Sequence, residues 1–217
     1  MSIQIEALTL GIAATNCYVI GDNQTKEAVV IDPVDNAARI QQAAQAHGWT
    51  IKKILATHGH FDHVLASKSL KEQTGAPFYI HEEGPYWLDS MPQQGLMFVG
   101  QPFPEAAKPD VLLSSALQTI TQGAIKLETL FTPGHSHDHI SFFMPEQRIL
   151  FGGDCLFAGS IGRTDLPHGD YDTLMRSIVD RLLPLGDDVR LLPGHMQETT
   201  IGRERQTNPF VLDYTNT

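Results

Sequence analysis

The sequence predicts a layered α/β protein. Short apolar runs typical of strands recur along the whole chain, and stretches with helical spacing of apolar residues interrupt them in both halves. One helical stretch follows each group of strands, which favours helices packed on sheets over a closed barrel. The length of 217 residues suits one compact domain or two small ones.

In the first third of the chain, turn signals separate the expected strands. Gly21-Asp22-Asn23 marks a turn, and Asp32-Pro33 ends a strand. Asn36 is expected to cap a helix that Gly48 ends. The expected strands are Ile3–Leu8, Cys17–Ile20, Ala28–Ile31, Ile51–Ala56 and Phe78–Ile80, and the expected helices are Ala37–His47 and Ser67–Gln73.

Residues 85–109 contain five of the thirteen prolines and show little periodicity. We interpret them as an irregular excursion, either a lid or a packed surface loop. Beyond them, Leu174, Ile178 and Leu182 form the apolar stripe of a helix that Pro184 ends. The strands expected here are Ala116–Ile120, Ile125–Phe131, Ile140–Met144, Arg148–Phe151 and Val189–Leu192, with helices at Asp170–Leu183 and Ile201–Gln206.

The composition excludes several classes of function. With a formal net charge of −10, the chain lacks the excess of basic residues that is typical of a nucleic-acid binder, and its binding to anionic membranes is disfavoured. Two cysteines, Cys17 and Cys155, cannot build a disulfide framework. The chain shows neither a signal-peptide pattern nor an apolar run long enough to cross a membrane, so we expect a cytoplasmic protein.

The strongest signal is a cluster of His58, His60, Asp62 and His63 directly after an expected strand. Imidazole nitrogen and carboxylate oxygen are the ligands that Zn²⁺ and similar cations select. In an extended chain His58 and His60 point the same way and can chelate one ion, while Asp62 and His63 face a second position. No structural need explains four such side chains together, so the cluster predicts a metal site.

Three further residues stand in matching contexts. His135 and His195 each follow a strand and a Pro-Gly turn, and Asp154 follows a strand that ends in Gly152-Gly153. Loops at strand ends commonly carry the functional residues of α/β proteins. Each residue taken singly could be structural, but together they complete a set of seven candidate ligands.

This order of motifs resembles the metallo-β-lactamase superfamily, and within it the short bacterial hydroxyacylglutathione hydrolases, the glyoxalase II-like group. Supporting stretches are Gly162-Arg163-Thr164-Asp165, residues 182–188 and Asn208-Pro209-Phe210. The resemblance implies a four-layer αβ/βα sandwich of two mixed sheets packed face to face with helices outside. It also implies a single domain over residues 1–217, without the C-terminal helical domain of full-length glyoxalase II.

By position, the resemblance implies two divalent ions per chain, zinc by first choice and iron or manganese as alternatives. One ion would be held by His58, His60 and His135, the other by Asp62, His63 and His195, and Asp154 would bridge them. The implied reaction is hydrolysis of S-(2-hydroxyacyl)glutathione, such as S-lactoylglutathione, to a 2-hydroxy acid and glutathione, a step of methylglyoxal detoxification. A metal-bridging hydroxide would attack the thioester carbonyl while Asp62, the catalytic residue, orients it.

Arg163 matches in position a basic residue that contacts the glutathione carboxylate in the family, so we expect it to bind substrate. This chain reads Arg163-Thr164-Asp165 where the full-length enzymes have a lysine and a tyrosine. His139 is expected to support the site rather than to bind metal. The expected partner is a small glutathione thioester, with no nucleic acid, no membrane and no obligate protein partner.

Other functions remain open at this point. A mononuclear-iron persulfide dioxygenase has the same fold and also reads Gly-Arg-Thr-Asp after its aspartate, although residues 182–188 and Asn208-Pro209-Phe210 favour the hydrolase. A lactonase or phosphodiesterase could use the same dinuclear site, with a pocket that does not recognise a thiol. A metal-binding module without turnover would be indicated by a broken ligand set, and all seven positions are present.

Overall fold

Two compact units make up the computed structural model, which describes residues 2–216. The first unit comprises residues 2–114 and 120–126, and the second comprises residues 115–119 and 127–216. Each unit has its own apolar core, built between helices and a six-stranded sheet.

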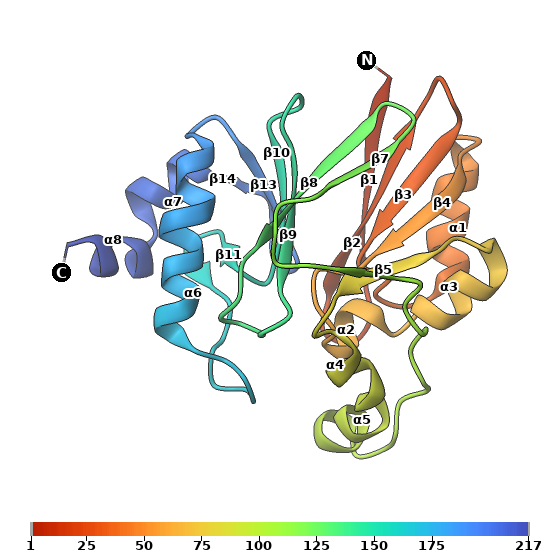
Figure 1. The fold of residues 1–217 in the computed structure, drawn as a ribbon, viewed down its shortest axis with the longest axis horizontal. Helices are drawn as coiled ribbons and strands as arrows, with labels where there is room; N and C mark the ends of the chain where they lie inside the picture. Colours follow the sequence, from red (N-terminus) through yellow and green to blue (C-terminus); the bar gives the residue numbers. More distant parts are fainter. Residues whose placement is uncertain (1, 217) are drawn as a thin grey trace. The chain divides into compact units, whose positions relative to one another are not determined.

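The first sheet is mixed and has the strand order β1-β2-β3-β4-β5-β6 (Figure 1). β1, β2 and β3 pair antiparallel, whereas β3 to β6 run parallel. All five strands predicted in this part of the chain are confirmed, and β6 was not predicted. The strands are β1 (Ile3–Leu10), β2 (Thr15–Asp22), β3 (Glu27–Ile31), β4 (Thr50–Leu55), β5 (Phe78–His81) and β6 (Val111–Leu113).

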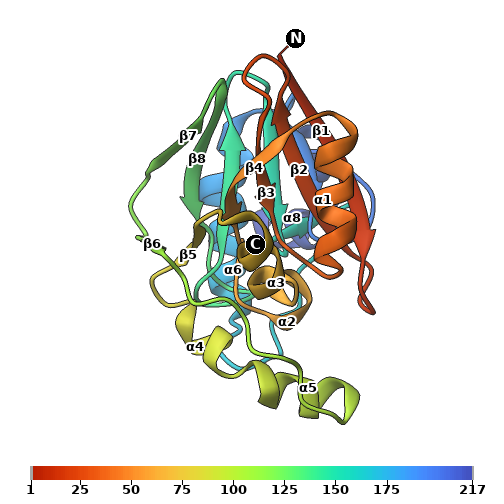
Figure 2. The ribbon, with the colours of Figure 1, turned by 90° about the vertical axis from the view of Figure 1, so that its right-hand side faces the viewer.

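Helices α1 (Ala37–Ala46) and α3 (Ser67–Thr74) pack against this sheet and lie in front of its strands in Figure 2. Both were predicted to within one residue at each end. The Asn36 side chain accepts a hydrogen bond from the Arg39 amide and so caps α1, as the sequence predicted. Buried residues of both helices, such as Ile40, join one apolar cluster with the sheet.

The parallel strands direct the chain to one edge of the sheet. Because β3 and β4 are parallel, their carboxyl ends lie at the same edge. Asp32 follows β3 directly, and residues 56–60 follow β4 and lead into the one-turn helix α2 (Phe61–Val64). Ligand sites of open α/β sheets gather at such edges.

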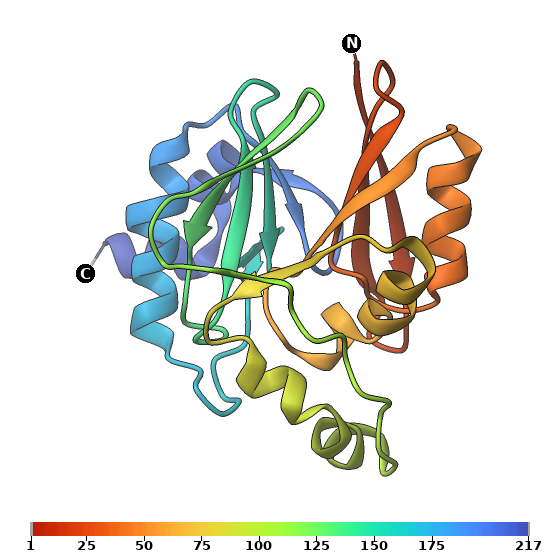
Figure 3. The ribbon, with the colours of Figure 1, turned by 45° about the vertical axis from the view of Figure 1, so that its right-hand side comes forward.

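Residues 85–109 contain two helices, which corrects the expectation of an irregular excursion. Pro85 begins α4 (Pro85–Asp89), and Pro92 lies in the first turn of α5 (Met91–Val99). A proline in the first turn gives up no intrahelical hydrogen bond, so these prolines start helices instead of excluding them. Figure 3 shows both helices beyond the end of the first sheet, on the side of α2.

The second sheet has the order β14-β13-β10-β9-β8-β7 and belongs to the second unit except for residues 120–126, which comprise most of β7, the turn after it and the first two residues of β8. β10 is parallel to β13, and the pairs β10–β9, β9–β8 and β13–β14 are antiparallel. The strands are β7 (Thr119–Gln122), β8 (Ile125–Phe131), β9 (Ile140–Met144), β10 (Ile149–Gly153), β13 (Arg190–Pro193) and β14 (Thr199–Thr200), and β11 (Leu156–Phe157) with β12 (Ser160–Ile161) forms a separate hairpin.

The strand predicted at Ala116–Ile120 lies about three residues too early, since β7 starts at Thr119. The amide of Gln118 donates to the Thr129 hydroxyl at 2.8 Å, so a side chain takes the place of the carbonyl that would extend the ladder. The other four strands predicted in this half are confirmed. β11, β12 and β14 have two residues each, too few for a periodic signal.

The helix predicted at Asp170–Leu183 is only partly α-helical. Asp170 caps α6 (Tyr171–Ser177), and the chain then forms a π-helical turn, η1 (Ile178–Leu182), and a 3₁₀ turn, η2 (Leu183–Leu185). Pro184 has no N–H to donate and its ring excludes an α-helical carbonyl four residues earlier, which accounts for the widened turn before it. The predicted apolar stripe is nevertheless fully buried.

The chain ends in two more helices, α7 (Ile201–Thr207) and α8 (Pro209–Thr215). α7 was predicted and α8 was not. The predicted fold class is confirmed, since two large mixed sheets with helices account for both units. Within residues 2–216, none of the helices combines the length and the apolar character that a membrane crossing requires.

Candidate functional site

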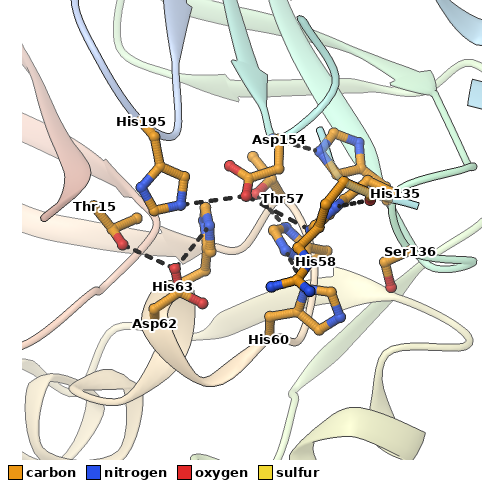
Figure 4. A network of polar contacts seen from close by, with 12 residues as sticks. Thr15, Thr57, His58, His60, Asp62, His63, His135, Ser136, Asp154 and His195 are labelled. Carbon is orange, nitrogen blue, oxygen red and sulfur yellow. Dashed lines mark hydrogen bonds and ion pairs between the residues drawn. The ribbon is translucent and has the colours of Figure 1, made fainter. Parts of the chain in front are cut away.

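The first unit gathers four of the predicted ligands on one loop and one short helix. His58 and His60 follow β4, and Asp62 and His63 lie on α2. The three imidazoles are buried, with exposed fractions of 0%, 6% and 0% for His58, His60 and His63. His58 Nε2 lies 3.0 Å from His60 Nδ1, and the ring centroids of His58 and His63 are 4.2 Å apart (Figure 4).

Asp62 completes this first cluster. Its Oδ2 atom accepts a hydrogen bond of 2.9 Å from the Thr15 hydroxyl at the start of β2 and lies 3.6 Å from His63 Nε2 (Figure 4). Three buried imidazoles and a carboxylate therefore converge, as the motif predicted. Thr15 was not predicted, because it lies far from the motif in the sequence.

Asp32 is a supporting residue that the sequence analysis treated only as the end of a strand. Its buried carboxylate accepts hydrogen bonds from the Thr57 amide at 2.7 Å and from the Thr57 hydroxyl, and it lies 2.9 Å from His63 Nδ1. A carboxylate at Nδ1 holds the proton there and directs Nε2 toward a metal. Asp32 also has a φ of 54°, a conformation that aspartate tolerates better than most residues. The signal in the sequence that could have identified Asp32 is an acidic residue at the end of a buried strand.

The second unit gathers the other three predicted ligands from three different turns. His135 follows β8, Asp154 follows β10 and His195 follows β13. Asp154 Oδ2 lies 3.6 Å from His135 Nε2 and 3.3 Å from His195 Nε2, so one carboxylate oxygen faces two imidazoles (Figure 4). Because β10 and β13 are parallel, their carboxyl ends bring Asp154 and His195 to the same edge.

Backbone and side-chain contacts orient this second cluster. His135 Nδ1 lies 2.8 Å from the Arg163 carbonyl oxygen, which leaves Nε2 facing Asp154. His139 Nε2 accepts a hydrogen bond of 3.0 Å from the Asp154 amide, and His139 Nδ1 contacts the Thr132 hydroxyl at 2.9 Å. His139 therefore supports Asp154, in the role the sequence analysis expected for it.

Two glycines permit close approaches at the second cluster. Gly134 has a φ of 132°, and a Cβ there would lie 2.2 Å from the Leu174 amide nitrogen. A Cβ on Gly162 would lie 1.9 Å from the Asp154 carbonyl oxygen. Such distances are shorter than side chains tolerate, so glycine is required at both positions.

The Arg163 side chain is exposed and forms an ion pair with Asp165. Its Nε and Nη2 atoms donate to the two carboxylate oxygens of Asp165 at 2.7 and 2.8 Å. This fork lowers the pKa of Asp165 to about 2 and raises that of Arg163. The side chain predicted to bind substrate thus already holds a carboxylate of its own chain, and its substrate-binding role remains a prediction.

The chemistry of both clusters fits divalent metal ions. Borderline cations such as Zn²⁺ select imidazole and carboxylate ligands, and metal-binding histidines usually have their second nitrogen fixed by another group, as His63 and His135 do here. All seven predicted ligands lie in these two clusters.

A model of the metallo-beta-lactamase superfamily matches residues 10–195, a span that contains all seven of these residues. The chain belongs to this superfamily. Membership confirms the family predicted from the motifs and the prediction of an enzyme of the metallo-hydrolase type. The fold of the superfamily implies divalent metal binding, and this chain carries clusters of histidine and aspartate that could hold such ions.

One curated relative within the superfamily supports the predicted subgroup. The hydroxyacylglutathione hydrolase GloC of Haemophilus influenzae is 39% identical over 210 residues, which cover 96% of this chain and 98% of GloC.

Similar solved structures confirm the fold. BLEG-1, a B3 metallo-beta-lactamase, has a TM-score of 0.90 at 35% identity, covering 96% of this chain and 99% of BLEG-1. TTHA1623, solved in a di-iron-bound form, has a TM-score of 0.84 at 35% identity and covers 94% and 99% of the two chains. ETHE1 from Myxococcus xanthus has a TM-score of 0.80 at 28% identity and covers 95% and 83%.

Proposed function

We propose that this protein is a dinuclear metal-dependent thioester hydrolase that converts S-(2-hydroxyacyl)glutathione to a 2-hydroxy acid and glutathione. The observation that carries the proposal is the complete set of imidazoles and carboxylates in the two clusters, of which Asp62 and His195 are partly exposed and the other five are buried. The 39% identity to a hydroxyacylglutathione hydrolase over nearly the whole chain supports the choice of substrate.

The ligands are proposed to divide between two ions. His58, His60 and His135 hold one, Asp62, His63 and His195 hold the other, and Asp154 bridges them. Within the first unit, the short distance between His58 and His60 supports a shared ion, and so does that between Asp62 and His63. Within the second unit, the position of Asp154 Oδ2 between two imidazoles supports a bridging role. Zinc is the first choice of metal, with iron and manganese as alternatives.

Bound divalent ions would supply a hydroxide at neutral pH and polarise the thioester carbonyl. Asp62, fixed by the Thr15 hydroxyl, orients the attacking water through its carboxylate. The Arg163 carbonyl and Asp32 hold the tautomers of His135 and His63 that this arrangement requires. Burial raises the pKa of both cysteine thiols, Cys17 and Cys155, so neither provides a competing thiolate nucleophile.

Substrate recognition is proposed to involve Arg163, whose guanidinium would exchange Asp165 for a carboxylate of glutathione. The two ions would offset the net charge of −10 locally and attract an anionic thioester. We place the reaction in the cytoplasm, as a step of methylglyoxal detoxification. A small thioester is the expected partner, without a nucleic acid, a membrane or an obligate protein partner.

A second candidate is a mononuclear-iron persulfide dioxygenase. The similarity to ETHE1 and the Gly162-Arg163-Thr164-Asp165 stretch favour it. It would use two histidines and one aspartate of the same set. The two candidates therefore differ in the number of ions each requires.

Metal content and turnover, measured in the same samples, test the proposal. Protein reconstituted with zinc, iron or manganese is analysed for metal per chain and assayed with S-lactoylglutathione, glutathione persulfide and a cephalosporin. About two ions per chain, with thioester cleavage that tracks the second ion, is the expected result. One iron per chain with oxygen uptake on persulfide and no thioester cleavage would overturn it, as would cleavage of the cephalosporin alone.

A further inference from the structure

Helices α4 and α5 contact residues 58–61 of the first unit, which we call the metal-ligand loop. The indole of Trp87, which is 6% exposed, meets the His60 ring edge-on with 4.5 Å between ring centroids. A Cβ on Gly59 would lie 2.6 Å from the Trp87 Cβ atom. Trp87 therefore packs on the backbone between His58 and His60, and this contact requires glycine at position 59.

Gln94 of α5 connects the same loop to α4 through its side-chain amide. Its Oε1 accepts a hydrogen bond of 2.9 Å from the Phe61 amide, and its Nε2 donates to the Trp87 carbonyl at 2.9 Å. The side chain is 6% exposed. Because one end accepts and the other donates, the orientation of the amide is determined by its partners.

Helix α2 needs such support because it has only one turn. Its first residue is Phe61, and the side chain of the N-cap residue, His60, accepts no hydrogen bond from the helix. An isolated helix of four residues is unstable in water, and its first amides need acceptors. Gln94 supplies the acceptor for Phe61 from another helix. The Phe61 ring also stacks on Phe103, with 4.9 Å between centroids.

We propose that Trp87 and Gln94 are positioning residues of the metal-ligand loop. They fix the turn from His58 to His60 and the start of α2, so that the ligands on both adopt the metal-binding arrangement before an ion arrives. Residues 85–109 then act as a fixed support of the site and not as a moving lid. The proposal rests on the metal-binding part of the proposed function and is independent of the substrate.

Neighbouring glutamines offer a matched test. Gln94→Met removes both hydrogen bonds of the amide, whereas Gln93→Met makes the same change at an exposed position of the same helix. Zn²⁺ affinity is measured by competition with a chelator, and Co²⁺ absorption reports the ligand geometry. We expect Gln94→Met to lose about 10- to 100-fold in affinity and Gln93→Met to remain like the parent protein. Equal affinities and spectra in two folded variants would overturn the proposal.

The role of the Trp87 ring is tested by two substitutions, one that keeps a ring and one that removes it. Trp87→Phe retains a ring edge at His60 and the Cβ atom against Gly59, and Trp87→Leu removes the ring. We expect near-parent affinity for the phenylalanine variant and about a tenfold loss for the leucine variant. Equal affinity in both would contradict a role for the ring.

Hydrogen exchange of the metal-free protein separates this proposal from the proposed function. Loss of protection at the Phe61 amide in Gln94→Met, but not in Gln93→Met, is expected whether or not a thioester is the substrate. Gln94→Asn shortens the side chain by one methylene, so that its amide cannot reach both the Phe61 amide and the Trp87 carbonyl, and it takes the place of Gln94→Met if that variant does not fold. Retained protection at Phe61 in Gln94→Met would refute the support. Parent protein that binds two ions without cleaving thioesters would refute only the proposed function.

Discussion

The ligand cluster of the first unit comes from six consecutive residues, whereas that of the second comes from three turns far apart in the sequence. In the first, local chain geometry brings His58, His60, Asp62 and His63 together, and supporting residues arrive from other elements. In the second, the ligands meet only because β8, β10 and β13 end at suitable places in one sheet. The geometry of the contiguous cluster therefore depends on residues of other elements that orient its side chains. The geometry of the dispersed cluster depends on strand register and on close approaches of the backbone.

Asp154 is the most sensitive point of the dispersed cluster. Because its Oδ2 atom faces both His135 and His195, we expect Asp154→Asn to lower metal content and to reduce hydrolysis by more than about 100-fold. Elemental analysis and kcat measure the two effects. Glu146→Ala, at an exposed carboxylate in the turn before β10, is the control. Retention of two ions with nearly full activity would remove the bridging role from the proposal.

The close approach of the Gly134 backbone to α6 is tested by adding a Cβ atom at position 134. Gly134→Ala is expected to destabilise the protein by about 3 kcal/mol, because the new Cβ would overlap Leu174 of α6. Gly48→Ala is the matched control, since Gly48 also has a positive φ but no atom within 4 Å of the new Cβ. Its expected cost is about 1 kcal/mol. Urea unfolding measures both, and equal costs would show that close packing at Gly134 is unimportant.

The support of the contiguous cluster is tested at Asp32. Asp32→Asn removes the charge that fixes the Nδ1 proton of His63, and we expect about a 10- to 100-fold loss of Zn²⁺ affinity. Chelator competition measures the change. Asp35→Asn, three residues further on, is the control and should bind as the parent protein does. If both variants bind Zn²⁺ equally, His63 needs no carboxylate partner at Nδ1.

The smallest effect is expected at the Arg163–Asp165 pair, which supports neither cluster through its side chains. The pKa of Asp165 is lowered to about 2 from an ordinary 3.8, so the pair contributes stability above that ordinary value and loses it as pH falls through the lower one. The stability difference between the parent and Asp165→Asn should be small and constant from about pH 8 to pH 5, should shrink as the pH falls further, and should disappear below about pH 2. Thermal unfolding across pH measures it.

The same variant tests Arg163 as a substrate contact. Without its partner the guanidinium is available to a substrate carboxylate, so KM for S-lactoylglutathione should fall in Asp165→Asn and rise in Arg163→Ala. An unchanged KM in both variants would remove Arg163 from the proposed binding site.

Much of the fold could be predicted because its signals are local. Asn36 caps α1 as its side chain predicted, and apolar runs marked the long strands. The errors arose where a distant group decides the conformation. Pro85 and Pro92 lie in the first turns of α4, which packs on His60 and Gly59, and of α5, which packs on α2. The hydroxyl of Thr129 shortens β7 at Gln118. Elements of two or three residues escaped prediction because they are too short for a period.

The candidate ligands were identified from residue type and spacing, since a set of seven imidazoles and carboxylates in the segments after strands has no structural explanation. Their supports were not. Asp32, Thr15, Trp87 and Gln94 are ordinary residues in the sequence, and each acquires its role from a partner far along the chain. The sequence by itself therefore determined the family and the donor chemistry, because these depend on which atoms the side chains carry. Only the tertiary structure decided which nitrogen of each histidine faces the ligand cluster and which helices hold the loop, because orientation depends on contacts that spacing does not encode.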